Sequence, residues 1–220
     1  METSRLQVPR RQRNPRITPS LGIPPNCEPP QPRSPPLVEA QRSFQSELRM
    51  VPSTRREARL LIAYFSYMGN TRRIAQALSE RLRKSYDVEI VEIVPTHKRS
   101  YLHWLAYSFV PDSEAEIENP ETELSRYDVV LLGFPKWTFS CPPVNRYIRK
   151  LRSLSKPRFY LFMTYGGFDE QRFLNSMTGR LTKMGCNIVE SLTIKRRQIQ
   201  SGTYAQSVDS FAKRVQEQLH

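Results

Sequence analysis

Residues 66–71, Ser-Tyr-Met-Gly-Asn-Thr, combine hydroxyl side chains with a glycine, directly after an apolar run and at the start of a helical pattern. In that position backbone N–H groups converge on an anion, and the helix N-terminus adds a partial positive charge. The side chains of Ser66, Asn70 and Thr71 offer further hydrogen bonds, so a phosphate monoester fits this loop without a lysine. A compatible alternative is that Asn70 or Thr71 caps the helix.

A second loop, residues 133–143, follows another apolar run and carries Trp137 next to Lys136. The rigid face of an indole stacks on a flat heteroaromatic ring. The alternative is that Trp137 packs against its own loop. Two prolines stiffen the end of this loop, and we expect the next helix to begin at Val144.

The third loop, residues 164–169, contains the pair Gly166-Gly167. Paired glycines permit close backbone approach to a ligand and unusual backbone angles, and Tyr165 offers a second stacking face. The alternative is a tight turn in which Asp169 caps the following helix. Together the three loops supply an anion cradle and aromatic walls.

The elements that must position these loops are short apolar runs that alternate with segments of helical spacing. We expect strands at residues 60–65, 88–94, 127–133, 158–163 and 186–194, and helices at 70–84, 144–154, 172–184 and 208–219. Such alternation predicts parallel pairing through right-handed crossovers, and strands that are apolar on both faces require helices on both sides of the sheet. The sequence therefore predicts a three-layer α/β sandwich of about five strands, with ligands at the carboxyl edge.

These loops resemble those of the flavodoxin family. Ser-x-x-Gly-Asn-Thr at 66–71 is similar to the family's FMN phosphate loop, residues 127–137 to its third strand and the flavin-contacting loop after it, and Thr-Tyr-Gly-Gly at 164–167 to its second flavin loop. The resemblance covers residues 59–220. It implies a flavodoxin-like, five-stranded parallel sheet in the order 2-1-3-4-5, and non-covalent FMN that transfers one or two electrons.

The resemblance also implies roles for single residues. The isoalloxazine ring would lie between Trp137 and Tyr165, with backbone contacts from the paired glycines of the third loop. The phosphate would be held by Ser66, Gly69, Asn70 and Thr71. The full set of predicted FMN-binding residues is Ser66, Met68, Gly69, Asn70, Thr71, Pro135, Lys136, Trp137, Thr138, Phe139, Thr164, Tyr165, Gly166, Gly167 and Phe168. No catalytic side chain and no metal ligand is predicted.

Two features differ from the acidic electron-carrier flavodoxins. Residues 58–220 carry 24 basic and 16 acidic side chains, and the tryptophan loop has a Trp…Pro-Pro-Val pattern instead of a small glycine-containing turn. Three functions stay open. The first is an electron carrier that docks on an acidic redox partner protein, the second is an NAD(P)H-dependent FMN oxidoreductase acting on quinones or similar acceptors, and the third is a flavin-free binding module. No nucleic-acid partner is expected, and the oligomeric state is left open.

Residues 96–120 are longer than a crossover helix needs, and aromatic and aliphatic side chains are dense between Tyr101 and Val110. The simplest expectation is a helix that covers the sheet. The alternative is a lid or partner surface beside the flavin. His97 and His103 lie in this segment without a carboxylate at ligand spacing, so they do not indicate a metal site.

Residues 1–57 differ in composition from the rest of the chain. They hold 11 of the 18 prolines and ten arginines, and their net charge is +5. Such a segment cannot bury enough apolar surface to offset chain entropy, so we predict a disordered Pro/Arg-rich extension. Organelle targeting or nucleic-acid binding are alternatives, but the prolines disfavour an amphipathic helix, and aromatic residues for base stacking are missing.

The cysteines and the apolar runs of the sequence indicate the cell compartment that we expect. The three cysteines, Cys27, Cys141 and Cys186, are scattered, which favours a reducing compartment over a disulfide framework, and we expect a cytoplasmic protein. No run reaches the roughly 18 apolar residues of a membrane span. Cys141 is expected to pack as a small apolar residue and not to act as a nucleophile.

Overall fold

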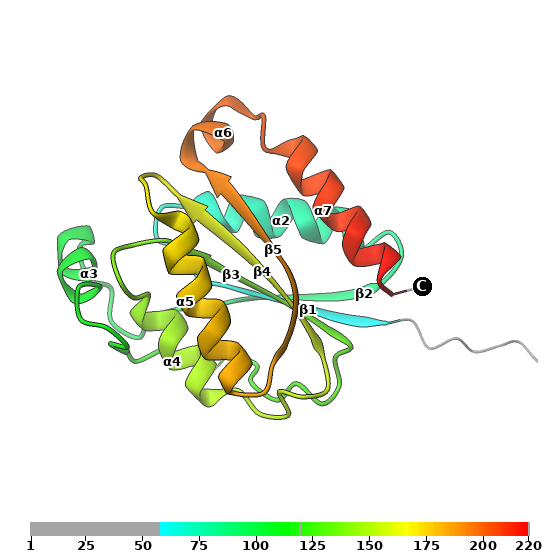
Figure 1. The fold of residues 1–220 in the computed structure, drawn as a ribbon, viewed down its shortest axis with the longest axis horizontal. Coiled ribbons are helices and arrows are strands. Elements are labelled where there is room, and N and C mark those ends of the chain that lie inside the picture. The colour runs from blue at the N-terminus through cyan, green and yellow to red at the C-terminus, as the bar shows by residue number, and fades with distance from the viewer. Residues whose placement is uncertain (1–57, 119, 220) are drawn as a thin grey trace, which may run out of the picture. The chain divides into compact units, whose positions relative to one another are not determined.

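The computed structural model describes residues 58–118 and 120–219, and the predicted disordered extension over residues 1–57 lies outside the described residues. Five strands form one sheet (Figure 1). They are β1 (Arg59–Tyr64), β2 (Asp87–Glu92), β3 (Val129–Pro135), β4 (Arg158–Tyr165) and β5 (Asn187–Lys195). All neighbouring strands are parallel and their order is β2-β1-β3-β4-β5, which confirms the predicted topology.

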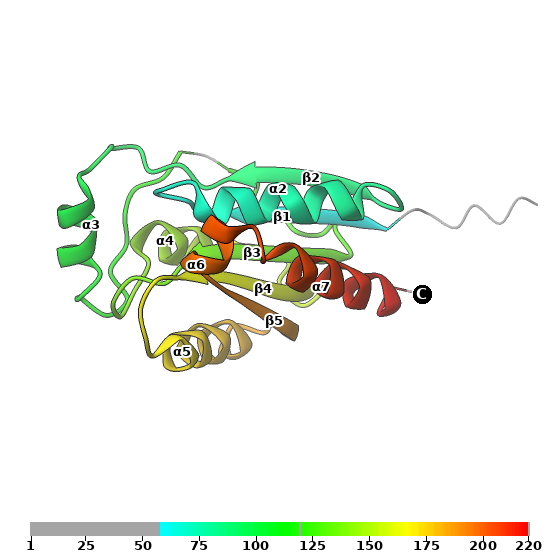
Figure 2. The ribbon, with the colours of Figure 1, turned by 90° about the horizontal axis from the view of Figure 1, so that it is seen from above.

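Helices cover both faces of the sheet. The described helices are α2 (Asn70–Leu82), α3 (Tyr101–Tyr107), α4 (Pro142–Lys150), α5 (Glu170–Lys183), α6 (Arg196–Ser201) and α7 (Ala205–Glu217). Helices α2 and α7 pack together on one face, and α4 and α5 lie on the other (Figures 1 and 2). This arrangement confirms the predicted three layers. Among the described residues, no helix has both the length and the apolar composition that crossing a bilayer demands.

Successive residues of the central strands point into two separate cores. In β1, Leu61 and Ala63 belong to the core beneath α4 and α5, whereas Leu60 and Ile62 belong to the core beneath α2 and α7. All four side chains are fully buried. Because side chains alternate across a strand, a strand covered on both faces must be apolar at every position. This is why the central strands appear in the sequence as continuous apolar runs.

Helix α4 differs from the expected range of 144–154. It begins at Pro142, because a proline fits the first helical turn, where its missing N–H has no partner to lose. It ends at Lys150, and Leu151 is extended with φ −63° and ψ 141°. Beyond it, the Arg152 N–H donates to the carbonyl oxygen of Thr122. The backbone therefore pairs with a neighbouring loop, while Leu151 and Leu154 still pack against the core and produce the helical spacing in the sequence.

The crossover from β2 to β3 corrects the expectation that a helix covers the sheet in residues 96–120. The helix formed there, α3, has seven residues and lies beyond the ends of the strands (Figure 2). Irregular chain takes the covering position instead, since Ile117, Leu124 and Tyr127 are buried in the core beneath α4 and α5. The prediction of a covering helix was therefore wrong, and α3 lies beside the carboxyl edge of the sheet instead.

Gly133 provides a test of the packing between β3 and β4. It lies opposite Phe162, and a Cβ added to it would be 2.1 Å from Cζ of that ring. Because Phe162 is fully buried and cannot move aside, Gly133→Ala should lower the free energy of unfolding by about 2 kcal/mol, as overpacking does. Urea unfolding measures this change.

The matched control is Gly179→Ala in α5, where an added Cβ has no atom within 4 Å apart from the adjacent residues and backbone of its own helix. Alanine in a helix interior should leave the stability unchanged or raise it by up to about 1 kcal/mol. Equal unfolding midpoints for the Gly133 variant and the unchanged chain would contradict the described packing.

Candidate functional site

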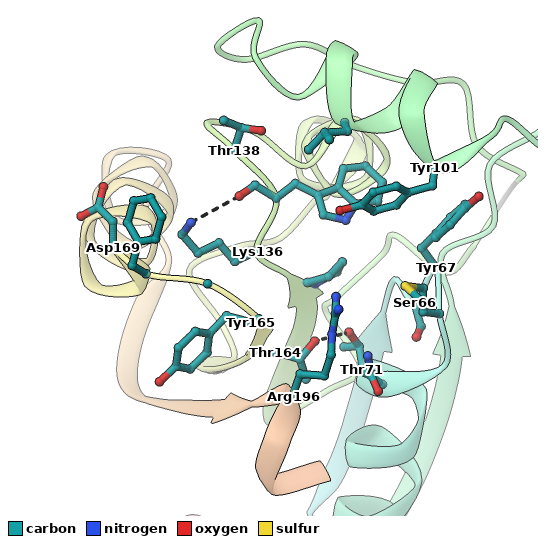
Figure 3. A pocket seen from close by; sticks show the side chains of 18 of the residues that line it. Ser66, Tyr67, Thr71, Tyr101, Lys136, Thr138, Thr164, Tyr165, Asp169 and Arg196 are labelled. Carbon is teal, nitrogen blue, oxygen red and sulfur yellow. Dashed lines mark hydrogen bonds between the residues drawn. The ribbon is translucent and has the colours of Figure 1, made fainter. Parts of the chain in front are cut away.

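The loops that follow β1, β3 and β4 surround one pocket of about 550 Å³ at the carboxyl edge of the sheet (Figure 3). This volume lies in the range of small-molecule sites. Of the site residues predicted from the sequence, all but Gly69 line this pocket. The lining residues that were predicted are Ser66, Met68, Asn70, Thr71, Pro135, Lys136, Trp137, Thr138, Phe139, Thr164, Tyr165, Gly166, Gly167 and Phe168.

Further lining residues were not in the predicted set. They are Tyr67, Tyr101, Leu105, Phe109, Asp169 and Arg196. Three of them come from α3 and the turn after it, so the aromatic density of residues 101–110 was the signal for them. Arg196 is the first residue of α6, directly after β5. The rule that ligands gather at the carboxyl ends of parallel strands, applied also to the strand before Arg196, would have included this position, although no motif marks it.

The first loop presents an anion-binding surface. Gly69 occupies the cap position of α2 with φ 78°, and no side chain caps this helix end, so the expected capping by Asn70 or Thr71 is not observed. The first turn of α2 contains no acidic residue. The hydroxyl of Ser66 is buried and has no hydrogen-bond partner among the described residues. A buried hydroxyl without a partner is costly, and an anion at the helix N-terminus would supply that partner.

A buried hydrogen bond joins the first loop to the third. The hydroxyl oxygens of Thr71 and Thr164 are 2.8 Å apart, and both side chains are almost fully buried. Only one of the two hydroxyl protons lies between these oxygens, so the accepting threonine keeps its own proton for another partner. The pair therefore fixes the spacing of the two loops and leaves one donor.

The second loop is held to α3 through Ser108, which is fully buried. The Ser108 hydroxyl donates to the carbonyl oxygen of Leu105 at 2.7 Å. Because a hydroxyl has one proton, its oxygen accepts the hydrogen bond from the Thr138 hydroxyl at 2.8 Å. The Ser108 carbonyl accepts the N–H groups of Phe139 and Ser140, both at 3.0 Å. These contacts join α3 and the second loop into one unit.

Aromatic rings connect α3 with the base of the pocket. Trp137 stacks on Trp104 with 6.0 Å between ring centroids and 28° between planes. Phe65 and Tyr67 meet Trp137 edge to face, at 5.5 Å and 6.3 Å between centroids. Trp104 is buried and covers one indole face. Trp137 therefore packs against more than its own loop, and it still lines the pocket.

The third loop carries a second aromatic ring, Tyr165, and a non-glycine residue with a left-handed backbone, Asp169. The Lys195 ammonium lies 5.9 Å from the centroid of Tyr165, its neighbour across β4 and β5, and so occupies one face of that ring. Burial and the nearby Glu170 carboxylate raise the pKa of Tyr165 above its ordinary value. Asp169 adopts a left-handed conformation, φ 62°, and its side chain does not cap α5. Asp169 therefore occupies the expected N-cap position of α5, but it makes no side-chain capping hydrogen bond there.

Arg196 adds a cation to the pocket. Figure 3 shows its side chain extending from the start of α6 toward Thr71 and Thr164. Its guanidinium passes so close to Gly166 that a Cβ there would be 3.3 Å from Cζ. No acidic residue in the described part of the chain pairs with Arg196. Helix α6 is itself held by buried Ile199, whose carbonyl accepts from Arg73 at 3.4 Å.

Cys141, at the end of the second loop, is fully buried. Burial raises the pKa of its thiol well above the ordinary value. A thiol that stays protonated at neutral pH is a poor nucleophile. The side chain belongs to the core beneath α4 and α5, as a small apolar residue does.

Comparisons with known proteins point to one family. A family model described as Flavodoxin matches residues 59–177. An uncharacterized protein of Archaeoglobus fulgidus is 34% identical over 137 residues, which cover 62% of this chain and 85% of that protein.

Solved structures share the fold at low sequence identity. A putative flavoprotein from Bacteroides uniformis is 21% identical with a TM-score of 0.58, over 72% of this chain and 99% of that one. Oxidised Flavodoxin 2 from Bacillus cereus is 20% identical with a TM-score of 0.51, over 73% and 99%. A flavoprotein from Lactobacillus acidophilus in complex with FMN is 18% identical with a TM-score of 0.50, over 62% and 93%.

The contacts of Ser108 generate a prediction. In Ser108→Ala the Thr138 hydroxyl loses its acceptor in a part-buried position, so the free energy of unfolding should fall by about 1 to 2 kcal/mol. Urea unfolding measures the change, and Ser210→Ala, on the exposed side of α7, is the control with no expected loss. If the two variants unfold at the same urea concentration, Ser108 does not hold the second loop.

Proposed function

Because this chain belongs to the flavodoxin family, we propose that it binds FMN non-covalently in the pocket at the carboxyl edge and acts as an electron-transfer protein. The observation that carries the proposal is the buried, partnerless hydroxyl of Ser66 beside the uncapped N-terminus of α2. The Ser66 hydroxyl and the helix N-terminus can both donate hydrogen bonds to an anion, and the aromatic wall of the same pocket can stack on a flat ring. The FMN complex of the similar Lactobacillus acidophilus flavoprotein supports the choice of flavin.

The residues of the pocket fit the two ends of FMN. The phosphate would accept hydrogen bonds from Ser66 and from the N–H groups at the start of α2, with Arg196 supplying a positive charge. The isoalloxazine would lie against Trp137 and the backbone of Gly166 and Gly167. When bound, the flavin supplies the redox chemistry, and the protein sets its position, its exposure and the charge around it.

Charge suggests the partner. The domain carries more basic than acidic side chains, and Lys136 and Arg196 line the pocket. Opposite charge speeds the encounter of redox proteins and orients them, so an acidic donor or acceptor protein is the partner that we propose.

The second candidate is NAD(P)H as electron donor. Anaerobic addition of NADPH to the FMN-loaded chain separates the two, because bleaching of the flavin absorbance within seconds would favour the enzyme over the carrier.

The phosphate site can be tested by comparing FMN with riboflavin, which lacks the phosphate. Ser66→Ala and Arg196→Gln should each weaken FMN binding about tenfold or more, because hydrogen bonds to charged groups contribute about 1.5 to 3 kcal/mol. Both variants should leave riboflavin affinity within about twofold of the unchanged chain. Quenching of flavin fluorescence on titration with protein gives both dissociation constants.

Lys183→Gln, an exposed position at the end of α5, controls for the loss of one positive charge and should not change FMN affinity. A chain that stays colourless with added FMN would refute the proposed function and favour a flavin-free binding module. Equal losses for FMN and riboflavin in the Ser66 variant would place the phosphate elsewhere.

The cations of the pocket should raise the reduction potential of the bound flavin, because the fully reduced form is an anion. Lys136→Gln should lower the midpoint potential by roughly 20 to 40 mV, which corresponds to about 1 to 2 kcal/mol for a two-electron couple. Raising the salt concentration should lower the potential of the unchanged chain more than that of the variant, since salt screens exposed charges. Potentiometric titration at two ionic strengths tests this, and a potential that responds to neither change would exclude the effect.

A further inference from the structure

A second pocket, of about 480 Å³, adjoins the first. It lies between the loop after β1 and the segment after β2, and Ser66 and Tyr67 line both pockets. The ring-binding loops at residues 135–139 and 164–168 do not contribute to it. The second pocket therefore adjoins the anion-binding loop of the first pocket, and its Trp104 stacks on Trp137 of the first pocket.

The inner surface of this second pocket is apolar and aromatic. Phe65, Ile93 and Trp104 line it and are almost fully buried, whereas Tyr67 is 38% exposed. The Tyr67 hydroxyl donates to the carbonyl oxygen of Arg99 at 3.4 Å, which holds this ring at the boundary between the two pockets. A flat ring entering the pocket would meet an aromatic side wall and an apolar base.

The outer rim of the second pocket is positively charged. Arg72 is neutralised by the Glu92 carboxylate, at 2.6 Å and 2.9 Å. By contrast, the side chains of His97, Lys98 and Arg99 make no hydrogen bond and no ion pair with any described residue that the structure records. Two permanent cations at consecutive positions, next to a wall that accepts a flat ring, match the two parts of a nucleotide.

We propose that the second pocket binds a nucleoside phosphate, with the base against Tyr67 and the apolar surface and the phosphate on Lys98 and Arg99. The volume is in the range of small-molecule sites. The base could belong to either of two sources. One is the adenylate half of a flavin dinucleotide, which would continue from a phosphate held at Ser66, and this source rests on the proposed flavin site. The other is a separate nucleotide that binds whether or not a flavin is present.

The test titrates AMP into the full chain, without flavin and again with FMN bound, and follows intrinsic fluorescence. The chain contains two tryptophans, Trp104 in the second pocket and Trp137 in the first, so tryptophan fluorescence reports on both pockets and the Lys98/Arg99 variant assigns the signal to the second. We expect saturable binding of AMP, and at least tenfold weaker binding of adenosine, which has no phosphate. The double variant Lys98→Gln/Arg99→Gln should weaken AMP binding tenfold or more and leave FMN affinity within twofold.

The matched control is Lys156→Gln/Lys183→Gln, which removes two exposed charges outside both pockets and should bind AMP as the unchanged chain does. AMP that does not bind at millimolar concentration, or that binds the Lys98/Arg99 variant as well as the unchanged chain, would overturn the proposal. Binding of AMP by a chain that fails to bind FMN would refute the proposed flavin site and support the second pocket as an independent nucleotide site.

Titration with FAD separates the two sources. If the adenylate belongs to the flavin, FAD should bind at least tenfold more tightly than FMN, the Lys98/Arg99 variant should lose that difference, and AMP should not bind the FAD-loaded chain. If the nucleotide is separate, FAD and FMN should bind alike and AMP should still bind beside either. Both results support a nucleoside-phosphate pocket, and they assign it to different ligands.

Discussion

Parallel pairing of β1, β3 and β4 is the constraint on which the site depends. Because neighbouring strands run in one direction, the loops that follow them must meet at one edge, however far apart they lie in the sequence. The hydrogen bond between Thr71 and Thr164 joins residues that are 93 positions apart in the sequence and that this pairing brings to the same edge. Side chains of β1 alternate between the two cores, so packing on both faces of the sheet holds this strand in place.

The sequence predicted those parts of the site in which suitable residue types directly follow a predicted strand. Residues 66–71 and the Gly166-Gly167 pair stand directly after apolar runs, so both their residue types and their place at the carboxyl edge were predictable. The fold was predictable for the same reason, because a strand buried on both faces cannot tolerate polar residues. The predicted end of α4 was wrong because Leu151 and Leu154 keep helical spacing in the sequence, although the backbone there pairs with another loop.

Other parts of the site had no local signature. Arg196 contributes to the pocket because α6 is held by Ile199 and Arg73, contacts that only the folded chain creates. The role of α3 depends on Ser108, an unremarkable serine whose hydroxyl and carbonyl bind the second loop. An aromatic-rich segment is equally compatible with a covering helix and with a pocket wall. In the folded chain Ile117 and Leu124 fill the core where a covering helix was expected, so the aromatic-rich segment forms a pocket wall.

The stacked pair of Trp104 and Trp137 links ligand binding in one pocket to ligand affinity in the other. Each indole lines a different pocket, and the two rings are stacked on one another. A molecule that tilts one ring therefore alters the shape offered to a molecule at the other. Thermodynamic linkage then demands reciprocity: the factor by which occupancy of the first pocket changes affinity at the second equals the factor in the opposite direction.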